Sequence, residues 1–555
     1  MLSIPQAIQT ALQHHQAGRL PQAEAIYRQV LQRQPRHADA LHLLGLIAHQ
    51  TGDDETAISL IGKAIAVNAN VADFYNNRGE AYRALGRLDD AVMSYEKALR
   101  LRPDFVEACY NQALALQEQG KPEEAVIRYQ RALMLRPDLS LAHNNLGNIL
   151  QKQGRLTEAV LHYERAIAIA PAYAEAYSNL GSVRQAQGRL EEAVACHRRA
   201  LALKPDYAGA YNNLGYALQD LGKLDESVRC YEQALEYQPD FADAHNNLGN
   251  VLGDTGRLNE AVAHYRQAMA LKPDHAGAHS NLVFTLSYIS DRDAESIFAE
   301  HREFTRRHAA PLAASIIPHP NDRTIDRRLK IGYVSGDFRN HSVAHFIEPV
   351  LAHHAHGSFE VFCYYNHSMV DEVTRRLQSY GGQWCTIAGL PDEQVAQQIR
   401  EDGIDILVDL SGHTRNNRLL LFARKPAPVQ VTWLGYPNTT GLPTMDYRIT
   451  DGFADPPGLT EHLHTEQLVR LPETFSCFRA PAECPAVGEL PLLRQGYVMF
   501  GSFNNSAKIN PQVLNLWGRI LLSVPEARLM LKRNGVGNRA IQELDVGRFS
   551  WNGIS

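Results

Sequence analysis

Four polar stretches of the chain carry side chains that suit ligand binding or catalysis. They cover residues 337–345, 411–415, 435–441 and 504–508, and each follows a short apolar run such as "LKIGYVSGDF" or "YVMFGSFNN". In parallel α/β sheets, ligands bind at the carboxyl ends of the strands. The sequence therefore predicts a site built from some of these stretches.

Lys508 lies in the stretch "GSFNNSAKINPQ" (501–512), which closes with a proline at an expected helix start. A helix N-terminus disfavours a cation unless an anion lies nearby. The pattern therefore indicates a place that holds a negatively charged group. A solvated lysine at the helix start is the alternative interpretation.

Three histidines fall in these stretches. His341 and His345 have the i, i+4 spacing of a metal pair, but neither a third ligand nor an HExxH glutamate accompanies them, so no metal site is predicted. On local evidence alone, His413 in "SGHT" is a loop histidine whose hydrogen bonds are satisfied within the protein.

The elements that position these stretches begin at Leu329. Short β-rich runs alternate with helical stretches such as "DEQVAQQIREDG", which predicts parallel α/β layers. Residues 283–327 are expected to form a helical connector and then a proline-rich linker.

The first half of the chain is a repeat array. Glycines recur every 34 residues from Gly18 to Gly256, and prolines keep nearly the same period. Each unit is predicted to be a helix, a turn at the glycine and a second helix. Because one such hairpin cannot bury its apolar face alone, the units must stack into a superhelix over residues 1–282. The pattern resembles the tetratricopeptide repeat.

An asparagine recurs at one helix position of the array. The seven members are Asn77, Asn111, Asn145, Asn179, Asn213, Asn247 and Asn281. Amide side chains on one surface can hold an extended peptide by its backbone without reading its sequence, so they are the candidate acceptor-binding residues. The alternative is that each asparagine bonds only within its own repeat.

Composition excludes several classes of protein. The net charge is −6 and there is no dense Lys/Arg block, which argues against a polynucleotide partner. No window approaches the apolar length of a membrane span, the N-terminus lacks a signal-peptide pattern, and the seven cysteines are scattered. A cytoplasmic protein is expected.

Taken together, "RRLKIGYVSGDFRNHSVAHFIEPVLAHH", "DGIDILVDLSGHTRNNRLLLFARKPAPVQVTWLGYPNTTG" and "FGSFNNSAKINPQVLNLWGRIL" resemble the catalytic part of the O-GlcNAc transferase and SPINDLY family. The resemblance covers residues 328 to 533 and implies a two-lobed GT-B glycosyltransferase after the repeats. It implies metal-free, inverting transfer of N-acetylglucosamine from UDP-GlcNAc to Ser or Thr of proteins. The SPINDLY branch implies O-fucosyl transfer from GDP-fucose as an alternative, and a non-catalytic repeat scaffold is a third reading.

The same resemblance implies roles for single residues. His341 and Lys508 are the expected catalytic groups, and Lys508, Asn505 and His413 the expected donor-binding groups. No cofactor or metal is implied besides the donor substrate. Two positions depart from the family pattern. Ser342 stands where the family usually has proline, which would loosen the loop that holds His341. Asn438 stands where the family has glycine, and an asparagine would crowd the backbone there if that glycine used a positive φ.

The remaining expectations concern the domains. Residues 328–496 are expected to form the N-terminal catalytic lobe, and residues 497–555 the start of a nucleotide-sugar lobe that the sequence does not complete. A GT-B donor is clasped between both lobes, so this chain by itself is expected to bind a nucleotide sugar weakly and to show doubtful activity.

Overall fold

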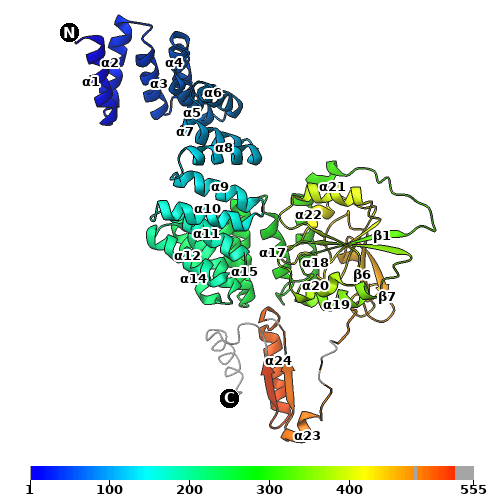
Figure 1. Ribbon diagram of the computed structural model, residues 1–555. Helices are drawn as coiled ribbons and strands as arrows, with labels where there is room; N and C mark the ends of the chain where they lie inside the picture. Colours follow the sequence, from blue (N-terminus) through cyan, green and yellow to red (C-terminus); the bar gives the residue numbers. More distant parts are fainter. Residues whose placement is uncertain (1, 481–483, 485, 505, 532–555) are drawn as a thin grey trace. The chain divides into compact units, whose positions relative to one another are not determined.

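The computed structural model describes residues 2–480, 484, 486–504 and 506–531. The chain divides into two compact units, residues 1–217 and 218–555, and each is described by itself. The first unit is helical. The second contains further helical hairpins, a large parallel sheet and a smaller strand pair (Figure 1).

The repeat region consists of paired helices of 13 and 14 residues, apart from the shorter α17. They are α1 (Ile4–Gln16), α2 (Leu20–Arg33), α3 (Ala38–Gln50), α4 (Asp54–Val67), α5 (Ala72–Ala84), α6 (Leu88–Leu101), α7 (Val106–Glu118), α8 (Pro122–Leu135), α9 (Ser140–Lys152), α10 (Leu156–Ile169), α11 (Ala174–Ala186), α12 (Leu190–Leu203), α13 (Ala208–Asp220), α14 (Leu224–Tyr237), α15 (Ala242–Asp254), α16 (Leu258–Leu271) and α17 (Ala276–Leu286).

Two kinds of glycine explain this repeat. The glycines at the predicted turns have positive φ, for example +77° at Gly188, a conformation that other residues adopt only with strain. A second set allows the two helices of a hairpin to approach closely. A Cβ on Gly147 would lie 2.7 Å from the ring of Tyr163, which is fully buried. The predicted helix, turn, helix unit is confirmed.

The two helices of each hairpin have different surroundings. In the first unit, odd-numbered helices of successive repeats contact one another, such as α5 with α7 and α9 with α11. Each even-numbered helix packs mainly against its odd-numbered neighbours. The odd-numbered helices therefore line the inner side of the curved array, and the even-numbered helices form its outer side.

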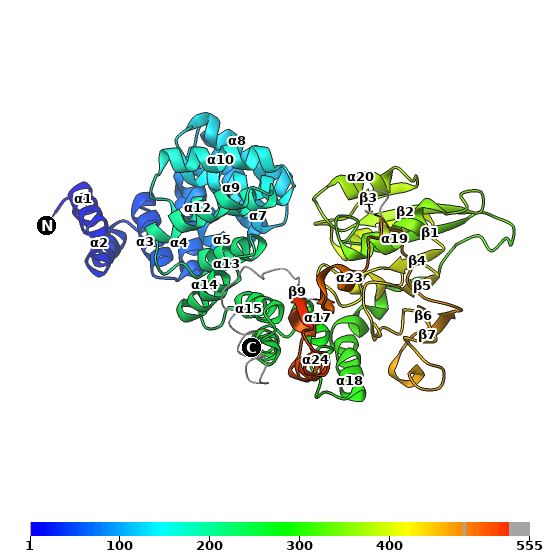
Figure 2. The same ribbon diagram turned by 90° about the horizontal axis from the view of Figure 1, so that it is seen from below.

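The second unit contains a parallel sheet of seven strands. The strands are β1 (Leu329–Ser335), β2 (Phe359–Tyr365), β3 (Gln383–Thr386), β4 (Ile406–Asp409), β5 (Val429–Thr432), β6 (Tyr447–Asp451) and β7 (Gln467–Leu471). Their order is β3-β2-β1-β4-β5-β6-β7, as the labels in Figure 2 show. The chain leaves β1 toward one edge and returns beside it at β4, so the topological switch point lies between β1 and β4.

Helices cover both faces of this sheet. On one face, α19 (Ser342–Ala352) and α20 (Glu372–Gln378) pack on side chains such as Val361 and Cys363. On the other face, α21 (Asp392–Asp402) and α22 (Leu419–Phe422) pack on Phe362 and Tyr364. The alternation along β2 is that of a strand buried on both sides, and the predicted parallel α/β lobe is confirmed.

The helical connector is part of this lobe. Helix α18 (Ala294–Phe304) continues into η1 (Thr305–Ala309) and η2 (Ala310–Ser315). Phe304 and Ala309 belong to the same buried cluster as the residues of α21 and α22. The sequence period ends before these helices, but their apolar side chains still complete the core of the sheet.

The segment after residue 490 forms a small pair of strands with two α-helices among its described residues. Its elements are α23 (Pro491–Gln495), β8 (Met499–Ser502), η4 (Ser506–Lys508), α24 (Pro511–Ser523) and β9 (Arg528–Leu531), and β8 pairs with β9 in parallel. The remaining short element of the lobe is η3 (Glu461–Leu463). Within the described residues, no helix has the length and apolar character needed to cross a bilayer.

Candidate active site

His341 lies at the switch point of the sheet, in the loop between β1 and α19. It is the N-cap of α19, and its Nδ1 accepts a hydrogen bond from the amide of Val343 at 3.3 Å. The side chain is 39% exposed, so its ring can reach a ligand. The short loop "GDFRN" after β1 and the start of the helix fix its position.

Asp337 accompanies this histidine, and the sequence did not single it out. Its Oδ2 lies 3.6 Å from Nδ1 of His341, and only 7% of the residue is exposed. Burial lowers the pKa of His341, an effect that the carboxylate of Asp337 partly offsets, and burial raises the pKa of Asp337. The imidazole is therefore neutral near pH 7 and has a carboxylate beside one of its nitrogens.

The ring can serve in two tautomers. While Nδ1 accepts from Val343, the proton of the neutral ring is on Nε2, which can donate to an oxygen. If Nδ1 carries the proton toward Asp337 instead, Nε2 becomes an acceptor for a substrate hydroxyl. Carboxylate, imidazole and hydroxyl in this order form the usual arrangement of a general base.

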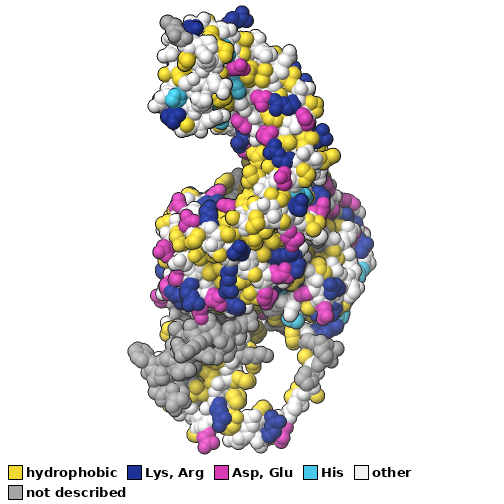
Figure 3. All heavy atoms as spheres, turned by 60° about the vertical axis from the view of Figure 1, so that its left-hand side comes forward, with side chains coloured by type: hydrophobic (Ala, Val, Ile, Leu, Met, Phe, Trp, Pro, Cys, Tyr) yellow, Lys and Arg dark blue, Asp and Glu magenta, His cyan; other side chains and the backbone are white. Residues whose placement is uncertain are grey.

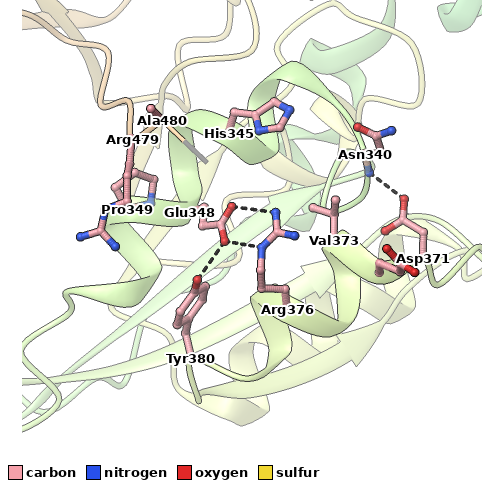
Figure 4. Close-up of a pocket in the computed structure, with 11 residues that line it drawn as sticks. Asn340, His345, Glu348, Pro349, Asp371, Val373, Arg376, Tyr380, Arg479 and Ala480 are labelled. Carbon is pink, nitrogen blue, oxygen red and sulfur yellow. Dashed lines mark hydrogen bonds and ion pairs between the residues drawn. The ribbon is translucent and has the colours of Figure 1, made fainter. Parts of the chain in front are cut away.

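A pocket of about 620 Å³ is lined by Asn340, the residue before His341, and by His345 on α19 (Figure 4). The backbone amide of Asn340 donates to Oδ2 of Asp371 at 2.7 Å. In the wall of the same pocket, Glu348 accepts from Arg376 at 2.6 Å and from the hydroxyl of Tyr380 at 2.8 Å. These bonds brace the wall of the pocket and hold the loop that carries His341.

His413 is fully buried in the loop after β4. Its Nε2 donates to the carbonyl of Thr440 at 2.9 Å, and its Nδ1 accepts from the hydroxyl of Ser280 at 3.1 Å. Burial, with His301 nearby, lowers its pKa well below 6.5. These contacts agree with the interpretation of a satisfied loop histidine, and contact of His413 with the donor stays a prediction.

The loop after β5 is held by buried polar groups. Thr439 donates to Glu466 at 2.6 Å, and Arg448 donates to the carbonyl of Asn438 at 2.8 Å. Asn438 is not among the residues with positive φ, so the asparagine at this place does not strain the backbone. A Cβ at Gly435 would lie 1.9 Å from the carbonyl oxygen of Leu410, so that position requires glycine.

The lysine predicted to face an anion is exposed, as that role needs. Lys508 ends η4 just before α24, which begins at Pro511 with Asn510 as its N-cap. The expected helix start is therefore confirmed. Asn505 lies outside the described residues. Lys508 belongs to the segment that contains β8, whereas His341 belongs to the lobe of the seven-stranded sheet.

The recurrent asparagines link successive repeats. Six of the seven donate from Nδ2 to the residue 35 positions earlier: Asn77 to His42, Asn111 to Asn76, Asn145 to Tyr110, Asn179 to Asn144, Asn213 to Ser178 and Asn281 to Asn246. Oδ1 of Asn247 accepts from Asn246. These six amides thus tie one odd-numbered helix to the preceding one, and the acceptor-binding role of all seven remains a prediction.

Proline at position 342 is expected to be tolerated and to stabilise the lobe. Ser342 is the first residue of α19, where an amide has no acceptor within the helix, and His341 has φ −152° and ψ 155°, which suits a residue before proline. We expect Ser342→Pro to raise the free energy of unfolding by about 0.4–1 kcal/mol. Urea unfolding followed by tryptophan fluorescence measures this, and a loss of stability would contradict the geometry.

Comparisons with known proteins agree with this architecture. Residues 272–478 match glycosyl transferase family 41, and tetratricopeptide repeats match segments that include residues 105–206. A solved structure of a mutant O-GlcNAc transferase from Thermobaculum terrenum is similar with a TM-score of 0.65 and 35% identity, covering 69% of this chain and 72% of that one.

Plant relatives match the same part of the chain. A SPINDLY protein of Oryza sativa, named a probable UDP-N-acetylglucosamine–peptide N-acetylglucosaminyltransferase, is 46% identical over 254 residues. The match covers 45% of this chain and 27% of the rice protein. The SEC protein of Arabidopsis thaliana is 34% identical over 217 residues, 37% of this chain and 22% of that protein.

A repeat array followed by an α/β lobe is the architecture that the chain shares with glycosyltransferases that carry tetratricopeptide repeats. The chain belongs to glycosyltransferase family 41, the family of the O-GlcNAc transferase and SPINDLY proteins.

Proposed function

We propose that this protein transfers N-acetylglucosamine from UDP-GlcNAc to Ser or Thr hydroxyls of proteins. The observation that carries the proposal is the pair of His341 and Asp337 at the switch point of a family 41 lobe. The names of the rice and Thermobaculum relatives support the donor and the reaction.

In the proposed reaction the acceptor oxygen attacks the anomeric carbon and the bond to UDP breaks, with inversion at that carbon. Nε2 of His341 takes the hydroxyl proton, and the carboxylate of Asp337, 3.6 Å from Nδ1, stabilises the positive charge that the ring gains. The leaving diphosphate gains negative charge, which Lys508 and the N-terminus of α24 offset. Asn505 and His413 are proposed as further donor contacts, by resemblance alone.

Donor binding by this chain alone is expected to be weak. Among the residues described after 497, the proposed diphosphate contacts are one exposed lysine and the N-terminus of α24, which contributes about as little at the surface. An exposed charge pair contributes at most about 1 kcal/mol, whereas binding near 10 μM needs roughly 7 kcal/mol. Calorimetric titration with UDP measures this, and micromolar binding would contradict the expectation.

The donor itself is tested in a fusion. The chain is joined after Leu531 to the corresponding remainder of the second lobe of the Thermobaculum relative. We expect this fusion to bind UDP more tightly than GDP and to transfer N-acetylglucosamine to a Ser/Thr peptide. Preference for GDP and GDP-fucose would establish O-fucosyl transfer instead. A folded fusion that binds neither nucleotide would favour the hypothesis of a non-catalytic repeat scaffold.

The repeat array is proposed to hold the acceptor protein through its asparagines. We expect replacement of Asn179, Asn213 and Asn247 by alanine to weaken the binding of unrelated peptides about tenfold or more, since each hydrogen bond contributes roughly 0.5–1.5 kcal/mol. Circular dichroism should show unchanged helix content. Fluorescence anisotropy with labelled peptides measures the affinity.

A matched control distinguishes peptide binding by the asparagines from their hydrogen bonds between neighbouring repeats. Asn144→Ala removes the acceptor that Asn179 uses on α9 but keeps Asn179 itself. We expect this variant to lose some thermal stability and to bind peptides normally. Equal loss of binding in both variants would return the asparagines to a purely structural role.

A further inference from the structure

The pocket of about 620 Å³ lies where two neighbouring strands of the sheet end (Figure 4). Asn340 is in the loop after β1, and Asp371 is in the loop after β2. Because β1 and β2 pair in parallel, both loops lie at the carboxyl edge of the sheet, where α/β proteins bind their ligands. The reaction proposed above leaves this pocket unused.

The pocket is connected to the loop that carries His341. The backbone amide of Asn340 donates to Oδ2 of Asp371 at 2.7 Å, and Oδ1 of Asp371 accepts from the amide of Thr374 at 2.8 Å. Burial would raise the pKa of Asp371, but these hydrogen bonds outweigh burial and lower the pKa, so the carboxylate is ionised near pH 7. A negative charge therefore contacts the residue that precedes His341.

Acidic groups outnumber basic ones in the pocket. Besides the imidazole of His345, its charged side chains are Glu348, Asp371, Glu372, Arg376 and Arg479. Glu348 and Arg376 neutralise each other through contacts of 2.6 and 3.1 Å. Arg479 is exposed and lies on the side of the pocket away from Asp371 (Figure 4). Within the described part of the chain, neither Asp371 nor Glu372 forms an ion pair, so two carboxylates remain without a cation.

The rest of the lining suits a long side chain with a charged end. Pro349, Val373, Ala480 and the ring of Tyr380 provide apolar surface. Lysine and arginine pack their aliphatic stems on such surface and keep the charged head among polar groups. A carboxylate ligand would be repelled by the two unpaired acids, and an apolar ligand would bury them without a partner.

We propose that this pocket is an acceptor subsite that holds a lysine or arginine side chain of the acceptor protein. The inference rests on the proposed function, because it takes His341 as the group that meets the acceptor hydroxyl. An extended peptide advances about 3.3 Å per residue, so a pocket that begins at Asn340 is reached from roughly one to three positions away from the glycosylated Ser or Thr. The cationic head pairs with Glu372 and Asp371, and the stem packs on Val373.

Attraction by the whole surface is a competing explanation for a preference for basic acceptors. The net charge is −6, and on the face drawn in Figure 3 acidic and basic side chains are interspersed without a large patch of one sign. Such a distributed field is screened by salt and depends neither on one carboxylate nor on one position of the peptide. A subsite depends on both.

Peptides with a single Ser or Thr test the subsite in the fusion described above. Each peptide carries lysine, alanine or glutamate at one position from −3 to +3. At one position we expect the lysine peptide to have a kcat/KM about tenfold above that of the alanine peptide, mainly through a lower KM, because the cation gains charge-assisted hydrogen bonds. The glutamate peptide should fall below both.

Two charge reversals locate the effect. Glu372→Lys should invert the ratio of kcat/KM between the lysine and glutamate peptides at that position. The matched control is Glu393→Lys, which changes the net charge equally at an exposed acid in the first turn of α21, on the other face of the sheet. This control should keep the ratio of the wild type. The same change of ratio in both variants would overturn the subsite.

The remaining outcomes separate the subsite from the proposed function. Transfer with equal kcat/KM to every peptide would overturn the subsite alone, as would a Glu372→Lys variant with a raised KM for the sugar nucleotide and an unchanged peptide ratio. Transfer to no peptide would overturn the proposed function. Fluorescence anisotropy with the unfused chain then decides about the pocket: the lysine peptide should bind about tenfold more tightly than the glutamate peptide, and equal affinities would contradict the subsite.

Discussion

Replacement of His341 by alanine is expected to lower the turnover of the transferring fusion by about 10²- to 10⁴-fold and to leave its affinity for UDP nearly unchanged. The imidazole acts on the acceptor proton in the transition state, whereas the diphosphate is bound by other groups. Single-turnover kinetics and calorimetry measure the two quantities separately. A loss confined to donor affinity would make His341 a donor-binding residue.

The neighbouring histidine provides the control. His345 lies one turn further along α19 and lines the pocket beside the site, so His345→Ala should keep most of the turnover. Asp337→Asn should lower turnover as well, because it removes the negative charge 3.6 Å from Nδ1 that stabilises the protonated ring. Since burial lowers the pKa of His341, the neutral ring persists below pH 6.5, and turnover should fall only at more acidic pH.

Acidification is expected to destabilise the second unit strongly. His301 is fully buried, with Nδ1 donating to the carbonyl of Ile297 and Nε2 accepting from Tyr436, and burial lowers its pKa to about 4. His413 is equally buried and satisfied as a neutral ring. Both join the connector to the catalytic loops, so protonation would place a charge inside that contact.

The sign follows from proton uptake. Between pH 6.5 and 4 the unfolded chain protonates these rings and the folded protein does not, so the free energy of unfolding decreases as the pH falls. Each histidine contributes about 1.4 kcal/mol per pH unit, or about 2 kcal/mol between pH 6.5 and 5. Two such groups remove a large part of the typical stability of a domain, which is about 5–15 kcal/mol.

Tryptophan fluorescence during urea unfolding measures the stability of the second unit selectively, because all four tryptophans lie after residue 383. We expect His301→Gln and His413→Gln to be less stable than the wild type at pH 7 and less sensitive to pH. His462→Gln, whose side chain is 62% exposed, should retain the full pH dependence. An unchanged slope in both buried variants would contradict the assignment.

Much of the fold follows from local patterns in the sequence. The glycine period predicts the hairpins because a turn with positive φ recurs once per repeat, as at Gly188. Apolar runs predict all the strands of the sheet except β3. That strand has four residues and lies at the sheet edge, where Trp384 and Cys385 are only half-buried, so its apolar signal is weak.

Contacts between residues far apart in the sequence could not be predicted from such local patterns. Tyr436 forms a hydrogen bond with His301, 135 residues earlier, and His413 forms one with Ser280, 133 residues earlier. The sequence around each of these residues does not indicate its partner. The connector was therefore predicted as a separate segment although it completes the core of the lobe. Asp337 did have a signal, because a carboxylate four residues before a histidine can orient its ring.

The most direct test of the proposed function is the intact mass of an acceptor peptide incubated with UDP-GlcNAc and the fusion that contains this chain. We predict the addition of one N-acetylhexosamine to a peptide with a single Ser or Thr, no addition when that residue is alanine, and almost none with the His341→Ala variant. An unmodified peptide despite release of UDP, or equal modification by the His341→Ala variant, would contradict the account.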